Sequence, residues 1–184
     1  MKNKLRLKNN IYLIIGLVLL LIAVLLILWF LLKGETKVVG GWTVDEKKDY
    51  LVCEISNKKY PLFEYANDDS NNTRINVVFG SKNIDSISLT HTQYLDSERE
   101  KTDSYNINNG AMSSQFGSDG LSARDYGLNF SKFDGGLQMS IFVNNGNFGT
   151  RSAKYFLLDG LNSFDSASVK RKYEDQGFKC NINN

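Results

Sequence analysis

Histidine, proline and cysteine are scarce in this chain of 184 residues, which has one histidine, one proline and two cysteines. A zinc enzyme draws several ligands from histidine, cysteine and carboxylate side chains, and the lone His91 forms no His-Glu-x-x-His pair. No Gly-x-Ser-x-Gly segment marks a nucleophilic serine. His91 lies within a predicted strand, so we expect a surface or sheet-face role for it. A triad built from dispersed serine and aspartate residues stays open as the alternative.

Motifs that hold phosphate or calcium are missing as well. The glycines between residues 146 and 149 are not followed by the Lys-Ser/Thr pair of a phosphate loop. The oxygen-rich segment 67–72 lacks the spacing of an EF-hand, because Thr73 stands where the sixth-position glycine is needed. The sequence therefore predicts a solvated turn at 67–72, and it predicts no catalytic, cofactor or metal site.

Acidic residues are absent from the start of the chain, since all 20 lie after residue 33. Residues 34–184 hold 17 of the 22 basic residues, which gives this part a net charge of −3. Nucleic-acid binding requires a basic surface that neutralises phosphates. The charge balance therefore excludes nucleic acid as an expected partner.

Residues 11–32 form an unbroken apolar run without a single charge. As a helix, the run would be about 33 Å long, enough to cross the hydrocarbon core of a bilayer. A helix on the surface of a soluble domain keeps a polar face, and this run has none. It is also longer than the core of a cleaved signal peptide, and no small-residue cleavage site follows it. We therefore predict an uncleaved transmembrane signal anchor that contacts the lipid bilayer.

The charges beside the apolar run predict its orientation. Four basic residues precede the run and no acidic residue accompanies them: Lys2, Lys4, Arg6 and Lys8. Basic residues next to a span are retained in the cytoplasm. We expect a cytoplasmic stub at 1–10, an anchor at 11–32 in the plasma membrane and everything after it outside the cytoplasm. Lys33 and Lys37 weaken this asymmetry without reversing it.

The outer part is predicted to consist of a flexible spacer at 33–41 and one domain at 42–184. Branched and aromatic residues predict a strand at 50–55. Alternating polarity predicts two antiparallel hairpins, one from strands 73–79 and 84–95 and one from strands 126–133 and 137–143. In the second hairpin, Asp134-Gly135-Gly136 provides the turn.

Helices are predicted at 153–161 and at 167–176, with Ser166 as the N-cap and Gly177 as the stop of the second. Helical spacing also occurs within 97–118, but Asn108-Asn109-Gly110 is expected to interrupt it. The fold class is therefore α+β, with an antiparallel sheet of about four to six strands packed against two or three helices.

Cys53 and Cys180 stand close to the two ends of the predicted domain. Thiols outside the cytoplasm oxidise readily, and a cysteine pair that brackets a domain is typical of a disulfide. We predict a Cys53–Cys180 disulfide. The alternative is two unpaired buried thiols that act as small apolar side chains.

The expected function follows from the anchor and from the missing catalytic motifs. Abundant asparagine, lysine in excess over arginine and a single proline are typical of an AT-rich bacterial gene. We expect a bacterial, non-enzymatic module of the cell envelope that binds a protein or an envelope glycan. The alternatives are a small envelope hydrolase and a pilin-like surface subunit. The chain lacks the glutamate that pilins carry early in their apolar helix, and Gly34, Gly40 and Gly41 follow the run.

Overall fold

The computed structural model divides the chain into two units, residues 1–36 and 37–184, each considered by itself. It describes residues 21–22, 24–25, 36–39, 42–45, 49–64, 70–81, 83–121, 126–143 and 147–183. In the first unit, the four described residues of the apolar run are helical: Leu21, Ile22, Val24 and Leu25. Within the described ranges, no helix has the length and apolarity that a membrane span needs. The stub at 1–10 and the rest of the anchor at 11–32 lie outside these ranges.

The second unit is built on a six-stranded antiparallel sheet with the strand order β6-β7-β5-β4-β3-β8. Its strands in chain order are β3 (Tyr50–Ser56), β4 (Asn71–Phe79), β5 (Ile84–Tyr94), β6 (Gly127–Phe133), β7 (Gly136–Val143) and β8 (Lys179–Asn183). With its helices, this sheet confirms the predicted α+β class. Two further strands, β1 (Thr36–Val39) and β2 (Trp42–Asp45), form a separate two-stranded sheet, and β1 lies inside the segment expected to be a spacer.

Alternating polarity sets which face of the large sheet is buried. One row of side chains crosses all six strands in register: Cys180, Cys53, Ile75, Leu89, Ile141 and Leu128. The four central members of this row are fully buried. The neighbouring positions on each strand point to the opposite face, as a period of two requires. The two predicted hairpins are thus confirmed.

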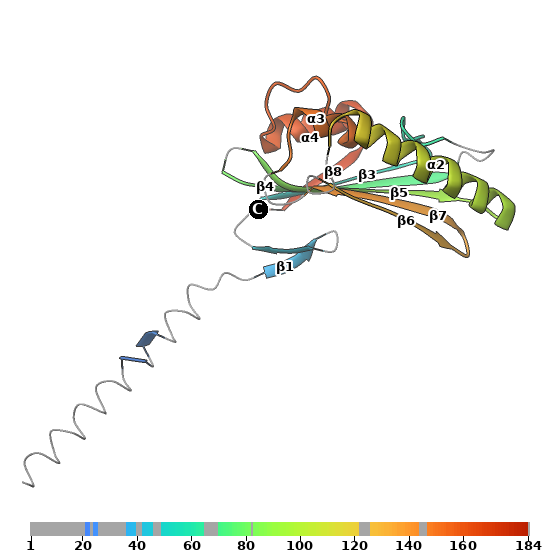
Figure 1. Ribbon diagram of the computed structural model, residues 1–184. Helices are drawn as coiled ribbons and strands as arrows, with labels where there is room; N and C mark the ends of the chain where they lie inside the picture. The colour runs from blue at the N-terminus through green and yellow to red at the C-terminus, as the bar shows by residue number, and fades with distance from the viewer. Residues whose placement is uncertain are drawn as a thin grey trace, which may run out of the picture. The chain divides into compact units, whose positions relative to one another are not determined.

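Helices α2 (Glu98–Ser118), α3 (Thr150–Ala153) and α4 (Ser166–Asp175) lie on one side of the sheet (Figure 1). Helix α2 begins after Ser97, whose hydroxyl accepts a hydrogen bond from the backbone N–H of Glu100. It continues without a break through Asn108-Asn109-Gly110, so the predicted interruption is wrong. The physical reason is a tertiary contact, because Asn108 is buried and hydrogen-bonded to the backbone of Glu64.

The helical bounds near the C-terminus also differ from those expected. The predicted helix at 153–161 is a turn of α3 followed by a 3₁₀ helix, η1 (Lys154–Phe156), and it stops at Leu157, which has a left-handed backbone with φ of 59°. The N-cap of α4 is Asp165 rather than Ser166, because the Asp165 carboxylate accepts a hydrogen bond from the N–H of Ser168. Gly177, with φ of 91°, follows the end of α4 as predicted.

Candidate functional site

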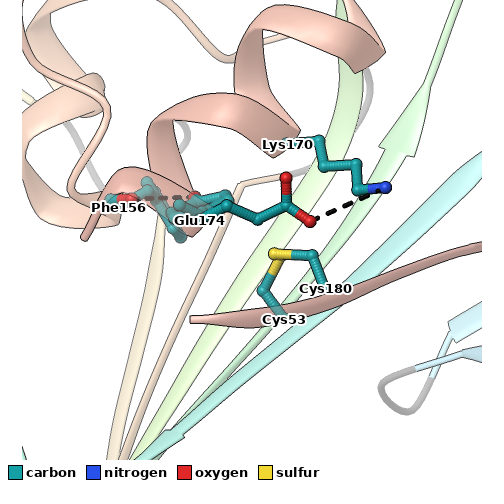
Figure 2. The surroundings of a disulfide bond; sticks show 6 residues. Cys53, Phe156, Lys170, Glu174 and Cys180 are labelled. Carbon is teal, nitrogen blue, oxygen red and sulfur yellow. Dashed lines mark hydrogen bonds and ion pairs between the residues drawn. A yellow bond between two sulfur atoms is a disulfide. The ribbon is translucent and has the colours of Figure 1, made fainter. Parts of the chain in front are cut away.

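Cys53 and Cys180 form the predicted disulfide. They lie directly opposite each other on β3 and β8, with Cα atoms 4.1 Å apart, and close a loop over a sequence separation of 127. Figure 2 shows the bond with Lys170 and Glu174 of α4 beside it, and these two side chains form an ion pair of 3.6 Å. The bond thus fastens the edge strand that follows α4 to the first strand of the large sheet.

His91 lies on the covered face of β5 and is fully buried. Its Nδ1 is 2.8 Å from Oγ1 of Thr73, and its ring packs against the rings of Tyr60 and Phe63, with centroids 5.7 and 4.9 Å away. Burial lowers the pKa of His91 from 6.5 to about 4, so the ring is neutral at physiological pH. It therefore occupies a sheet face, as expected, on the side that is closed to solvent. That position does not suit a general base, which must reach a substrate proton.

A chain of buried polar groups joins α2 to the sheet. Ser104 donates a hydrogen bond of 2.8 Å to the Gln93 side chain, and Asn108 donates to both the carbonyl oxygen and the hydroxyl of Ser104. Asn108 also holds Glu64 through both of its backbone polar groups, accepting from the N–H at 2.6 Å and donating to the carbonyl at 2.8 Å. These contacts position α2 and the segment after β3, and they stay inside the protein.

The carboxylates with shifted pKa values are dispersed over the surface. The pKa of Asp119 is lowered chiefly by the hydrogen bond from Lys154, whose Nζ lies 2.6 Å away, and then by the hydroxyl of Tyr155. Hydrogen bonds from Ser163 and Ser168 lower the pKa of Asp165 to about 2. A general acid needs a raised carboxyl pKa near a second, ionised group. Neither Asp119 nor Asp165 meets that requirement.

The structure also bears on the oxygen-rich segment 67–72. Residues 65–69 lie outside the described ranges, whereas Asn71 and Asn72 are the first residues of β4. Across the described portion of the chain, no three residues of the histidine, cysteine, aspartate or glutamate type come together as metal ligands.

Two surface pockets are lined entirely by described residues. The first, here called the β3–α4 pocket, has a volume of about 130 Å³. Its lining combines apolar residues with four polar ones: Ile55, Tyr60, Pro61, Leu157 and Phe178, with Lys58, Lys59, Thr73 and Gln176. The second, the α2–α3 pocket, measures about 250 Å³ and is lined by Gly120, Leu121, Asn147, Gly149, Thr150, Arg151 and Ser152. Both are smaller than the roughly 300–1,000 Å³ of typical small-molecule sites.

The sheet face opposite the helices is polar in part, and on it Val78 packs with Tyr50 and Val52. One row across it runs from Arg74 through Thr90 and Ser140 to Asn129. Arg74 forms an ion pair of 3.0 Å with Glu54 on the neighbouring strand, and both side chains are about half exposed. In β5, Thr90 points away from the face of Leu89 and His91, as the period of two requires.

Sequence reasoning missed both pockets. Ile55 and Phe178 meet in the β3–α4 pocket although 123 positions separate them, since β8 pairs with β3. Only the predicted disulfide hinted that these two ends of the domain come together. Lys58 and Lys59 follow the predicted strand 50–55, and nothing in the local sequence marks them as part of a pocket.

Comparisons with known proteins add little. No protein-family model matches the chain, and no curated protein matches it either. A structural search finds a Streptococcus pneumoniae TIGR4 protein solved by NMR, with 11% identity and a TM-score of 0.40 over 82% of this chain and 94% of that one. A likeness of this strength supports no argument about fold or function.

Proposed function

We propose that the chain is a single-pass membrane protein of the bacterial envelope whose outer domain binds another protein and performs no catalysis. The observation that carries the proposal is the size and chemistry of the two pockets. Each is too small for a typical metabolite or cofactor, but either has room for a side chain of a protein partner.

The membrane location rests on the apolar run and on its described residues. Leu21, Ile22, Val24 and Leu25 are helical, and their side chains are 47–56% exposed. At 100° per residue these four positions fall within an arc of about 160°, which is less than half of the circumference of a helix. The uncharged length of the whole run, 11–32, is what favours a lipid environment over a place in a protein core. The four basic residues before the run favour a cytoplasmic N-terminus.

The disulfide supports a location of the domain outside the cytoplasm, because such bonds persist in oxidising compartments. The surroundings of the catalytic candidates support binding over hydrolysis. His91 is sealed in the core, and the shifted carboxyl pKa values run downward rather than upward. No described feature favours the hydrolase or the pilin-like alternative.

Site-specific photo-crosslinking of the full chain in living bacteria tests the proposal. A photoreactive residue would be placed at three exposed or half-exposed positions: Pro61 beside the first pocket, Arg151 in the second and Thr90 on the polar sheet face. An adduct of defined mass at one position, absent without irradiation, supports protein binding and identifies the face. Adducts that disappear after glycosidase treatment would instead indicate an envelope glycan. The absence of an adduct at all three positions would count against a binding module.

The topology is tested separately with protease added to intact protoplasts. Loss of the outer domain, together with survival of a fragment holding the first ten residues, is the expected result. Full protection of the domain would contradict the proposed orientation.

A further inference from the structure

We propose that the β3–α4 pocket receives one aliphatic side chain of leucine or methionine size from a partner protein, and that acidic residues flank this side chain. The inference rests on the proposed function and names the chemistry of the partner. It is carried by the volume of the pocket, by the state of its polar groups and by the charge at its mouth.

The volume fits one side chain. Liquid water takes about 30 Å³ per molecule, so the pocket of about 130 Å³ has room for roughly four water molecules, or four non-hydrogen atoms. A leucine side chain has four carbon atoms. Interfaces often depend on a few such anchors that fill a pocket and exclude water.

The polar groups in the lining already have partners within the protein. The Thr73 hydroxyl pairs with His91 at 2.8 Å, and the Tyr60 hydroxyl donates to the carbonyl oxygen of Tyr155 at 2.8 Å. The side-chain amide of Gln176 donates to the carbonyl oxygen of Leu157, also at 2.8 Å. A guest therefore need not supply hydrogen bonds to these three side chains. Apolar side chains, including Ile55 and Phe178, supply much of the rest of the lining, which favours a guest without polar atoms.

The mouth of the pocket is positively charged. Lys58 donates one of its three N–H groups to the carbonyl oxygen of Gln176, and no described carboxylate forms an ion pair with it. No acidic residue lines the pocket. Carboxylates on either side of the aliphatic anchor would complement this charge, and they would lie in a rim where contacts chiefly set the rate and specificity of association.

The test uses the full chain in zwitterionic lipid nanodiscs and three labelled peptides. The probe is the acetylated and amidated peptide Asp-Glu-Leu-Asp-Glu; one control replaces its leucine with alanine and the other replaces its four acids with lysine. Fluorescence anisotropy gives the affinities, and methyl NMR of isoleucine reports whether Ile55 is the site. We expect the leucine peptide to shift the Ile55 signal and to bind at least about fivefold more tightly than the alanine control. The lysine control should not bind, and added salt should weaken the complex.

Matched variants locate the contact. Ile55→Phe fills the pocket and should abolish the difference between the leucine and alanine peptides, whereas Ile55→Val leaves the pocket open and should keep it. Lys58→Gln should reduce the affinity by about threefold to fivefold and flatten its salt dependence. Lys170→Gln on α4 removes the same charge outside the pocket and should have no effect. Melting temperatures of all four variants show whether each one is folded.

Equal binding of the leucine and alanine peptides would overturn the inference, as would full affinity in a folded Ile55→Phe variant. Tighter binding of hexanoate than of the peptide at Ile55 would also overturn it, because the pocket would then serve a small amphiphile. Photo-crosslinking that still yields a protein adduct at Arg151 or Thr90 would leave the proposed function standing while this pocket assignment fails.

Discussion

Oγ1 of Thr73 and Nδ1 of His91 lie 2.8 Å apart in the core, where the two residues face each other across β4 and β5. The pair is closed to solvent, since Thr73 is 2% exposed and His91 not at all. The ring of His91 packs against the rings of Tyr60 and Phe63. The imidazole is therefore stable in this place only while it carries no charge.

Acidification is expected to weaken the fold through His91. Burial lowers the pKa of His91 to about 4, whereas in the unfolded chain it is near 6.5. Between these values the unfolded state binds a proton that the folded state does not, so stability falls as the pH drops from about 6.5 to about 4. The loss approaches roughly 3 kcal/mol at the lower limit. Urea unfolding of the full chain in mild detergent, followed by near-ultraviolet circular dichroism, measures it.

The control for this prediction is His91→Gln, which cannot titrate. Its free energy of unfolding should be lower than that of the native chain at pH 7 but should change little between pH 6.5 and 4.5. Surface carboxyl groups such as Asp165, whose pKa is lowered to about 2, weaken the fold only as the pH falls below about 4. An equal pH slope in both proteins would show that His91 is not responsible.

Removal of the Cys53–Cys180 bond is expected to destabilise the domain by about 2–5 kcal/mol, because the bond restricts a loop spanning 127 positions in the unfolded chain. Thermal unfolding of Cys53→Ala/Cys180→Ala, compared with the native chain before and after reduction, measures the loss. Reduction should bring the native chain close to the double variant and leave the variant unchanged. Detection of two free thiols by mass spectrometry of the unreduced native protein would contradict the bond itself.

Asn108→Ala should cost about 1–3 kcal/mol, since it leaves the N–H and the carbonyl group of Glu64 without their side-chain partner. The exposed Asn106→Ala, two positions earlier in α2, provides the matched control and should be neutral or slightly stabilising. Hydrogen exchange adds a local measurement, because the Glu64 amide should lose protection in the first variant only. Equal stability of the two variants would mean that Asn108 does not hold the segment after β3.

The strands of this fold could be predicted because each one carries its own evidence. Ile75, Val77 and Phe79 stand two positions apart in β4, and the same period recurs around Leu89, so that burial on one face follows from local sequence. Helix α2 could not be predicted with the same certainty, because Asn108 and Gly110 are poor helix formers. What holds the helix together there is a contact with Glu64, 44 positions away, which no local pattern contains.

The candidate site was still less predictable. A pocket depends on the order of strands in the sheet, and β8 lies beside β3 although it ends the described chain. Charge and hydropathy patterns do not show that Ile55 and Lys58 line a pocket. The pocket forms only because Phe178 and Gln176, near the other end of the sequence, lie beside them in the fold. The cysteine pair was the one sequence feature that joined these two ends.

Two glycine substitutions should have opposite effects, and together they test the backbone of the structure. Gly110 lies in the middle of α2 with open space where a Cβ would stand, so Gly110→Ala should raise the stability by about 0.5–1 kcal/mol.

Gly136, at the start of β7, has φ of 152°, and a Cβ there would stand 2.0 Å from the carbonyl oxygen of Gln93. Gly136→Ala should therefore cost at least about 3 kcal/mol. Melting temperatures of the two variants decide the matter: a stable Gly136→Ala protein would mean that β5 and β7 do not approach as closely as this register requires.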